Sequence, residues 1–136
     1  MTSAVQPSDP IAGRLTGVIG ELGLFFSFGE AGGAPVWSLT FTGPDDPPAQ
    51  LLISLDSQWV TVSHVGPDLV PVGSERALLA LNADLAVAKV GITQDGAWLA
   101  AGQIPRHDLD AIHLGEAISA VLTAVKAARD ALAAAK

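Results

Sequence analysis

The stretch "NADLAVAKVGITQDGAWLAAGQIP", residues 82–105, contains an Asp-Gly pair at positions 95–96 between two segments of alternating side chains. Asp-Gly is a strong signal for a two-residue type I′ hairpin turn, and it predicts strands over 86–93 and 97–104. Successive side chains of a strand point to opposite faces, so this register directs Trp98 away from the apolar side of the hairpin. The sequence therefore predicts a large aromatic ring outside the core.

A second hairpin is indicated by "LLISLDSQWVTVSHV", residues 51–65. A two-residue turn at Asp56-Ser57 would pair Ile53 with Val60 and leave Trp59 on the face opposite the aliphatic side chains. A slip of one residue would scatter those side chains over both faces, so the pattern favours this pairing. The predicted core face consists of Leu51, Ile53, Leu55, Val60 and Val62.

The remaining elements follow from helical spacing, alternation and capping residues. Pro10, preceded by Asp9 as N-cap, begins a first helix, and "VWSLTFT" predicts a strand over 36–42. The glycine-rich "FFSFGEAGGAP" between them is interpreted as a break. Ser74 caps a short helix, "ERALLALNA", and Asp108 or Asp110 caps a long last helix.

The predicted order is therefore α-β-β-β-α-β-β-α. It indicates an α+β domain with a five-stranded antiparallel sheet and the first and last helices packed on one face. Residues 1–8 are expected to be a flexible lead-in, and 9–136 to form one domain.

Composition narrows the functional classes. The net charge is −7, and residues 1–70 hold seven acidic residues against Arg14 alone, so a phosphate backbone would be repelled. The chain has no cysteine and no run of about 18 apolar residues, and its first ten residues lack the basic and apolar regions from which we would expect a secretory signal. We expect a cytoplasmic protein that binds neither nucleic acid nor membrane.

The run "LLALNADLAVAKVGITQDGAWLAAGQIPRHDLDAIHLGEAISAVLTAV" resembles the YbjN-like family, which shares its fold with the class I chaperones of type III secretion. The resemblance covers about residues 9 to 132. It implies a small acidic homodimer that holds a segment of a partner protein without hydrolysing it. In such chaperones the short central helix and the neighbouring strand form the dimer contact, which here corresponds to Leu78, Leu79, Leu81, Leu85 and Val87.

Both hairpins place a tryptophan on the face opposite the aliphatic core, among hydroxyl groups. Rigid aromatic rings suit contact surfaces, so we expect the second subunit or a bound partner segment to cover this face. The alternative is a lid from the same chain, either "GEAGGAPVW" or "GPDLVPVG". The predicted partner-binding or dimer face consists of Trp59, Trp98, Thr61, Leu52 and Ile104.

No established catalytic motif is present, and we expect no enzyme activity and no cofactor. His107, Asp108, Asp110 and His113 could supply metal ligands, but their spacing matches no known site and aspartates before a helix are ordinary caps. His64 is expected to be a hydrogen-bonded structural residue. The alternative function is a small-ligand sensor with a pocket between sheet and helices, where Gly13, Gly17 and Gly20 of the first helix could leave room.

Overall fold

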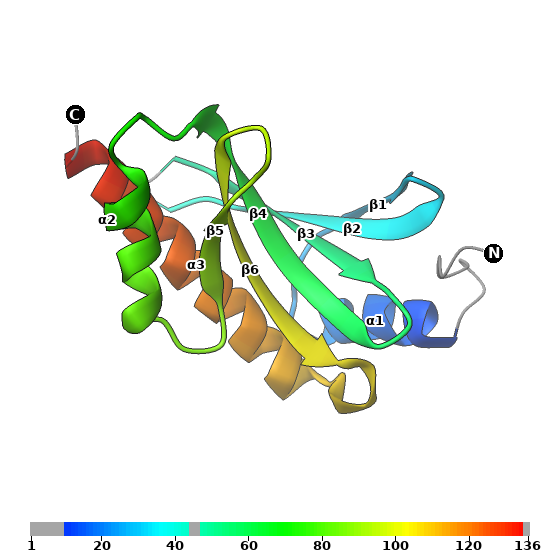
Figure 1. Ribbon diagram of the computed structural model, residues 1–136. Helices are drawn as coiled ribbons and strands as arrows, with labels where there is room; N and C mark the ends of the chain where they lie inside the picture. Colours follow the sequence, from blue (N-terminus) through cyan, green and yellow to red (C-terminus); the bar gives the residue numbers. More distant parts are fainter. Residues whose placement is uncertain (1–9, 44–46, 135–136) are drawn as a thin grey trace.

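A six-stranded antiparallel sheet carries helices α1 and α3 on one face (Figure 1). The computed structural model describes residues 10–43 and 47–134, so the expected lead-in and the Asp9 cap lie outside the described residues. The strand order is β1-β2-β3-β4-β6-β5. The elements are α1 (Pro10–Glu21), β1 (Ser27–Ala31), β2 (Ala34–Phe41), β3 (Ala49–Leu55), β4 (Trp59–Leu69), α2 (Glu75–Ala80), η1 (Leu81–Ala83), β5 (Lys89–Ile92), β6 (Ala97–Pro105), η2 (Arg106–Asp108) and α3 (Ala111–Ala134).

The core lies between the sheet and the apolar stripes of α1 and α3. Leu15 and Ile19 of α1 are fully buried, and the Trp37 indole of β2 donates a hydrogen bond to Thr16 Oγ1 over 3.0 Å. In α3 the buried residues recur at helical spacing from Leu114 to Ala128. Among the described helices, α3 alone is long and apolar enough by composition to cross a membrane, but its apolar stripe is occupied by packing on the sheet.

The β3–β4 hairpin has the predicted core face but a different turn. Leu55 pairs with Val60 and Ile53 with Val62, which shifts the predicted pairing by two residues. An even shift keeps each side chain on its face, so the five predicted core residues are all buried. The turn residues are Ser57 and Gln58 because the Asp56 carboxylate accepts the backbone N–H groups of residues 58 and 59 and holds the chain there.

The predicted register of the β5–β6 hairpin is wrong by one residue. Ile92 pairs with Trp98 instead of Leu99, because the turn has three residues, 94–96, and Gly96 adopts φ +88° at its last position. This is the three-residue loop in which a type I turn is followed by a left-handed residue. A one-residue shift turns β6 over relative to β5, so side chains predicted for its open face lie on its core face. Trp98, 2% exposed, and Ile104, 7% exposed, therefore face the core.

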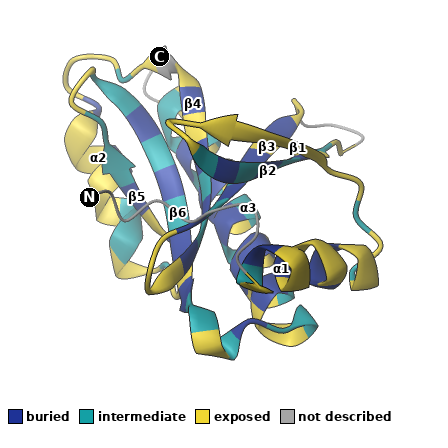
Figure 2. Ribbon diagram, turned by 90° about the vertical axis from the view of Figure 1, so that its right-hand side faces the viewer, coloured by how far each residue is buried: buried dark blue, intermediate teal, exposed yellow. Residues whose placement is uncertain are grey.

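Strand β1 was not predicted. Its residues belong to the segment interpreted as a break, but Gly32 and Gly33 adopt φ +60° and +82° and form the two-residue turn between β1 and β2. All five β1 residues are exposed, so the strand has no burial alternation for the sequence to report (Figure 2). The sheet therefore has one strand more than predicted.

Candidate functional site

Trp59 is the exposed tryptophan of the chain and begins β4. Its side chain is 37% exposed, whereas Trp37 and Trp98 are buried. The Asp56 turn places it by accepting its backbone N–H over 2.7 Å. Trp59 lines two surface hollows that lie on either side of it.

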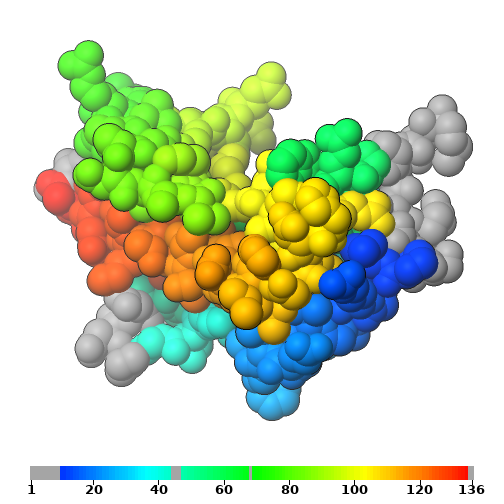
Figure 3. All heavy atoms as spheres, turned by 90° about the horizontal axis from the view of Figure 1, so that it is seen from below, coloured from blue at the N-terminus to red at the C-terminus, as the bar shows by residue number. Residues whose placement is uncertain are grey.

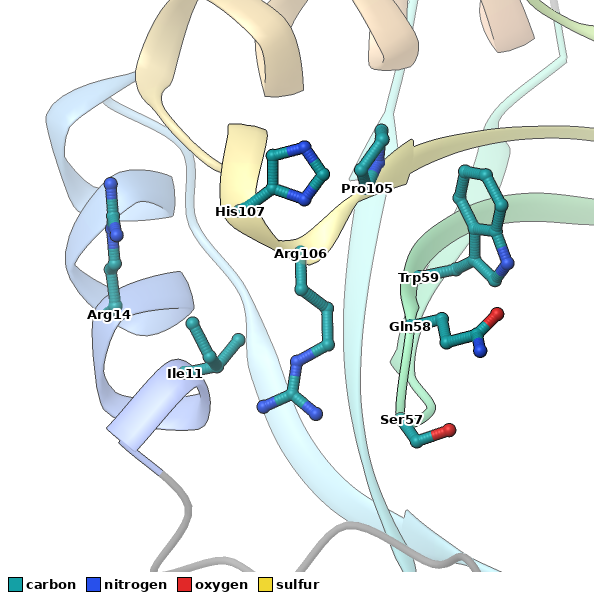
Figure 4. A pocket seen from close by; sticks show the side chains of 8 residues that line it. All are labelled: Ile11, Arg14, Ser57, Gln58, Trp59, Pro105, Arg106 and His107. Atoms are coloured by element: carbon teal, nitrogen blue, oxygen red, sulfur yellow. The ribbon is translucent and has the colours of Figure 1, made fainter.

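The first hollow is a groove of about 620 Å³ between α1, the β3–β4 turn and the end of β6 (Figure 4). Figure 3 shows the neighbouring α1 and η2 from below. The backbone N–H of Arg106 donates to Gln58 O over 3.0 Å, and its guanidinium donates to Asp56 O over 3.1 Å, so η2 is tied to the turn. The lining residues are Ile11, Arg14, Ser57, Gln58, Trp59, Pro105, Arg106 and His107.

The second hollow, about 390 Å³, lies on the sheet face opposite the helices. Its floor crosses β4 and β6, where the Gln103 amide donates to Thr61 Oγ1 over 3.1 Å. Val87 and Lys89 line its far side. The open face of the sheet therefore carries a mixture of polar and apolar groups around one indole ring.

Three of the five residues predicted for the partner face lie on this open face. Trp59 is exposed, Thr61 is half-buried two residues along the same strand, and Leu52 is half-buried further along the face, paired with Ser63. Trp98 and Ile104 lie in the core, for the turn-length reason given above, and their predicted positions are wrong. Neither loop considered as a lid lines the hollows at Trp59, while Gly66 packs against Trp98, where a Cβ on Gly66 would lie 2.1 Å from the indole nitrogen.

The predicted dimer residues fall into three groups by burial. Leu78 is fully buried in the core, so it offers no surface to a second subunit, and its proposed contact is wrong. Leu81 and Leu85 are half-buried and pack against the core. Leu79, 44% exposed, and Val87, 56% exposed, present apolar surface to solvent.

A cluster of exposed phenylalanines borders β1 and was missed by the sequence reasoning. Phe25 is 97% exposed and Phe28 is 50% exposed, and the Phe28 ring packs edge-on against Trp37 with centroids 5.1 Å apart. Phe26 is 37% exposed. The signal was available as three phenylalanines within four residues, but the nearby glycines were given more weight.

The two edges of the sheet differ. At β5 the Asn82 side chain accepts the Val90 N–H over 2.7 Å and donates to Val90 O over 2.8 Å, which occupies that edge as a neighbouring strand would. At the other edge, β2 is the one strand of residues 10–43 and 47–134 that pairs with β1. Pro35 has no N–H, so its pair with Glu30 is a non-hydrogen-bonded pair. Because hydrogen-bonded and non-hydrogen-bonded pairs alternate along antiparallel strands, the N–H and C=O groups of Glu30 and Phe28 point away from β2.

Asp110 caps the N-terminus of α3. Asp110 Oδ1 accepts the His113 N–H over 2.7 Å and contacts His113 Nδ1 at 2.8 Å. These hydrogen bonds lower the pKa of Asp110 and raise that of His113. His107 Nε2 lies 3.6 Å from Asp108. Within residues 10–43 and 47–134, no three acidic or histidine side chains lie close enough to share a metal ion.

His64 is a buried structural residue, as predicted. Its Nδ1 N–H donates to Gln50 O over 2.9 Å, and its ring lies 5.2 Å from that of Trp98. The glycines of α1 do not support the sensor interpretation. Gly13, Gly17 and Gly20 are exposed and face open space, so they line no cavity between helix and sheet.

Comparison with known proteins identifies the fold. No protein-family model matches the sequence, and no curated protein matches it. The structure is similar to a chain of the HopA1–SchA chaperone–effector complex, with a TM-score of 0.65, 18% identity, and coverage of 93% of this chain and 98% of that chain. It is also similar to a chain of the Yersinia pestis type III secretion chaperone SycH in complex with a stable fragment of YscM2, with a TM-score of 0.57, 17% identity, and coverage of 85% and 98%.

These similarities confirm the predicted α+β fold and its likeness to secretion chaperones. At such identities they establish the fold alone. Membership of the YbjN-like family remains a prediction.

Proposed function

We propose that this protein is a non-enzymatic, chaperone-like or regulatory module that holds an extended segment of a partner protein. The observation that carries the proposal is the β1 edge, a strand that within the described residues pairs on one side only and is bordered by exposed phenylalanines. Solved chains of the same fold come from chaperone–effector complexes, which supports it. We further propose that it acts in the cytoplasm.

The chemistry of the β1 edge suits strand addition. An incoming extended segment would pair with the outward backbone groups of Phe28 and Glu30 and place alternate side chains against the phenylalanine cluster. Asn82 occupies the opposite edge, so one edge is favoured over the other. Such binding needs no rigid cavity, which fits the shallow hollows of this surface.

We also propose that the protein is a homodimer, with Leu79 and Val87 in the contact. Both are exposed aliphatic side chains near α2, where the resemblance to secretion chaperones leads us to expect the second subunit. The alternative of a small-ligand sensor is not supported, because the glycines of α1 face open space and line no cavity between helix and sheet.

The proposal is tested by photo-crosslinking in the native host. One variant carries a photo-reactive residue at Phe25, and a control carries it at Val72, which is 99% exposed on a loop away from β1. We expect one recurrent protein to be crosslinked at Phe25 but not at Val72.

Glu30→Pro then removes an outward N–H without touching the β1–β2 ladder, and should reduce the crosslink several-fold. Glu30→Ala, which keeps the N–H, should retain it. Equal crosslinking at both positions, or full crosslinking in a folded Glu30→Pro protein, would contradict strand addition at this edge.

A further inference from the structure

Glu30 places an unpaired negative charge at the β1 edge of the sheet. It lies opposite Pro35, and its exposed carboxylate forms no hydrogen bond or ion pair with residues 10–43 or 47–134. Strands β1, β2 and β3 contain no lysine or arginine, so no basic side chain of these strands stands beside it. A charged side chain on an edge strand opposes pairing with another strand unless that strand supplies the opposite charge.

The charge of the surrounding chain favours a basic partner at this edge. Residues 1–70 hold seven acidic residues against Arg14 alone, and the net charge of the chain is −7. A basic segment is attracted to such a surface and an acidic segment is repelled. Charge complementarity therefore selects among the extended segments that the backbone of β1 could accept.

Phe28 shares one face of β1 with Glu30. The two residues are two positions apart in a strand, so both side chains project on the side where the Phe28 ring contacts Trp37. The Phe28 side chain is 50% exposed and can take a further apolar contact. The opposite face of β1 carries small residues, namely Ser27, Gly29 and Ala31. Side-chain recognition on β1 therefore depends on one ring and one carboxylate.

An added strand would meet these two side chains in a defined order. The outward backbone groups are those of Phe28 and Glu30, so the residues directly opposite them would have Cβ atoms about 5 Å away. Antiparallel pairing is favoured because it is slightly the more stable arrangement, and β1 already pairs with β2 in this way. In an antiparallel segment, the residue opposite Glu30 comes first and the residue opposite Phe28 follows two positions later.

We propose that the β1 edge binds an extended, antiparallel client segment in which an arginine or lysine precedes a bulky apolar residue by two positions. The basic side chain pairs with Glu30, and the apolar side chain packs on Phe28. The inference rests on the proposed function and adds the chemistry and the direction of the client segment.

The test follows the Phe28 amide signal of the ¹⁵N-labelled full chain, because this N–H points outward and would gain an acceptor. The probe is a blocked peptide of sequence Thr-Arg-Thr-Leu-Thr-Leu-Thr. One control peptide has glutamate in place of arginine, and the other has the reversed sequence and therefore the same composition and charge. We expect the probe to shift the signal saturably, and to bind about fivefold more tightly than the glutamate peptide and about threefold more tightly than the reversed peptide.

Two charge variants separate the local pair from the charge of the whole molecule. Glu30→Lys should abolish the preference for arginine over glutamate. Glu75→Lys changes the net charge equally but lies on α2, across the molecule from β1 (Figure 1), and should retain the preference. Glu30→Ala keeps the outward N–H and should bind both peptides with little preference. The indole signals of the buried Trp37 and Trp98 report whether each variant is folded.

Equal binding of the arginine and glutamate peptides would overturn the inference, as would an unchanged preference in Glu30→Lys or tighter binding of the reversed peptide. If a client is still crosslinked at Phe25, any of these results leaves the proposed function in place and removes only this inference. A Phe28 signal that no peptide moves also overturns the inference, and the proposed function fails with it if no client is crosslinked at Phe25.

Discussion

His64 illustrates how one buried polar residue couples this core to pH. Its Nδ1 N–H has a partner in Gln50 O, but Nε2 is buried with no hydrogen-bond partner among the described residues. Protonating Nε2 would place a charged N–H there without an acceptor. Burial accordingly lowers the pKa of His64 below 6.5, the nearby Arg129 lowers it further, and the bond to Gln50 opposes them.

We predict that stability falls as the pH decreases from 6.5 toward the folded-state pKa of His64. The unfolded chain binds the proton more readily in that window, so acid favours unfolding. The Asp110–His113 pair affects stability at other pH values. Its contribution from the raised pKa of His113 is lost as the pH rises above 6.5, and its contribution from the lowered pKa of Asp110 is lost as the pH falls below 3.8.

The measurement is the free energy of unfolding from urea titrations between pH 5 and 7.5. His64→Leu should remove the decline on the acid side. An NMR titration that placed the His64 pKa at or above 6.5 would contradict the prediction.

At the scale of elements, the length of the β5–β6 turn determines which face of the sheet Trp98 occupies. The three-residue turn before β6 directs Trp98 into the core, where it lies against the bare backbone of Gly66 in β4. A side chain at position 66 would occupy the space of the indole, because its Cβ would come within 2.1 Å of the ring. The absence of a side chain at this position therefore allows β4 and Trp98 to pack together.

We predict that Gly66→Ala lowers the free energy of unfolding by about 1–3 kcal/mol, the usual cost of overpacking. The matched control is Gly29→Ala in β1, where a Cβ meets nothing within 4 Å and a change within about 0.5 kcal/mol is expected. Urea denaturation of both variants gives the comparison. Equal effects at the two positions would mean that Trp98 does not occupy this site.

At the scale of the whole molecule, the surface divides into regions with different chemistry. The β1 edge offers backbone groups and phenylalanines, the Trp59 groove offers an exposed indole between α1 and η2, and Leu79 and Val87 offer aliphatic surface near α2. The strand order places β1 and β5 at opposite edges of the sheet. A client at β1 and a second subunit near β5 would therefore not compete.

We predict a particle of twice the 13.8 kDa chain mass in light scattering at micromolar concentration. Leu79→Glu should shift it toward the monomer, because the charge would have to be desolvated in an apolar contact. Ile112→Glu is the control, since Ile112 is 71% exposed at the start of α3 and outside the proposed contact. A wild-type monomer over the whole concentration range, or dimers of both variants, would rule out this interface.

The sequence by itself determined the α+β class, the helical stripes and the core face of the β3–β4 hairpin. Hydrophobic periodicity reports which side of an element is buried, and a two-residue error in pairing leaves that side unchanged. Leu51 and Ile53 were assigned correctly for this reason, although the turn beside them was displaced.

Only the tertiary structure decided the position of Trp98, the existence of β1 and the assembly of the Trp59 groove. The sequence pattern allows Trp98 on either face of the hairpin. Its actual face is set by the length of the turn and by the space that Gly66 leaves for the indole. An exposed edge strand leaves no alternation to detect. The groove joins residues from three elements distant in the chain, and their proximity follows from packing, which no local pattern encodes.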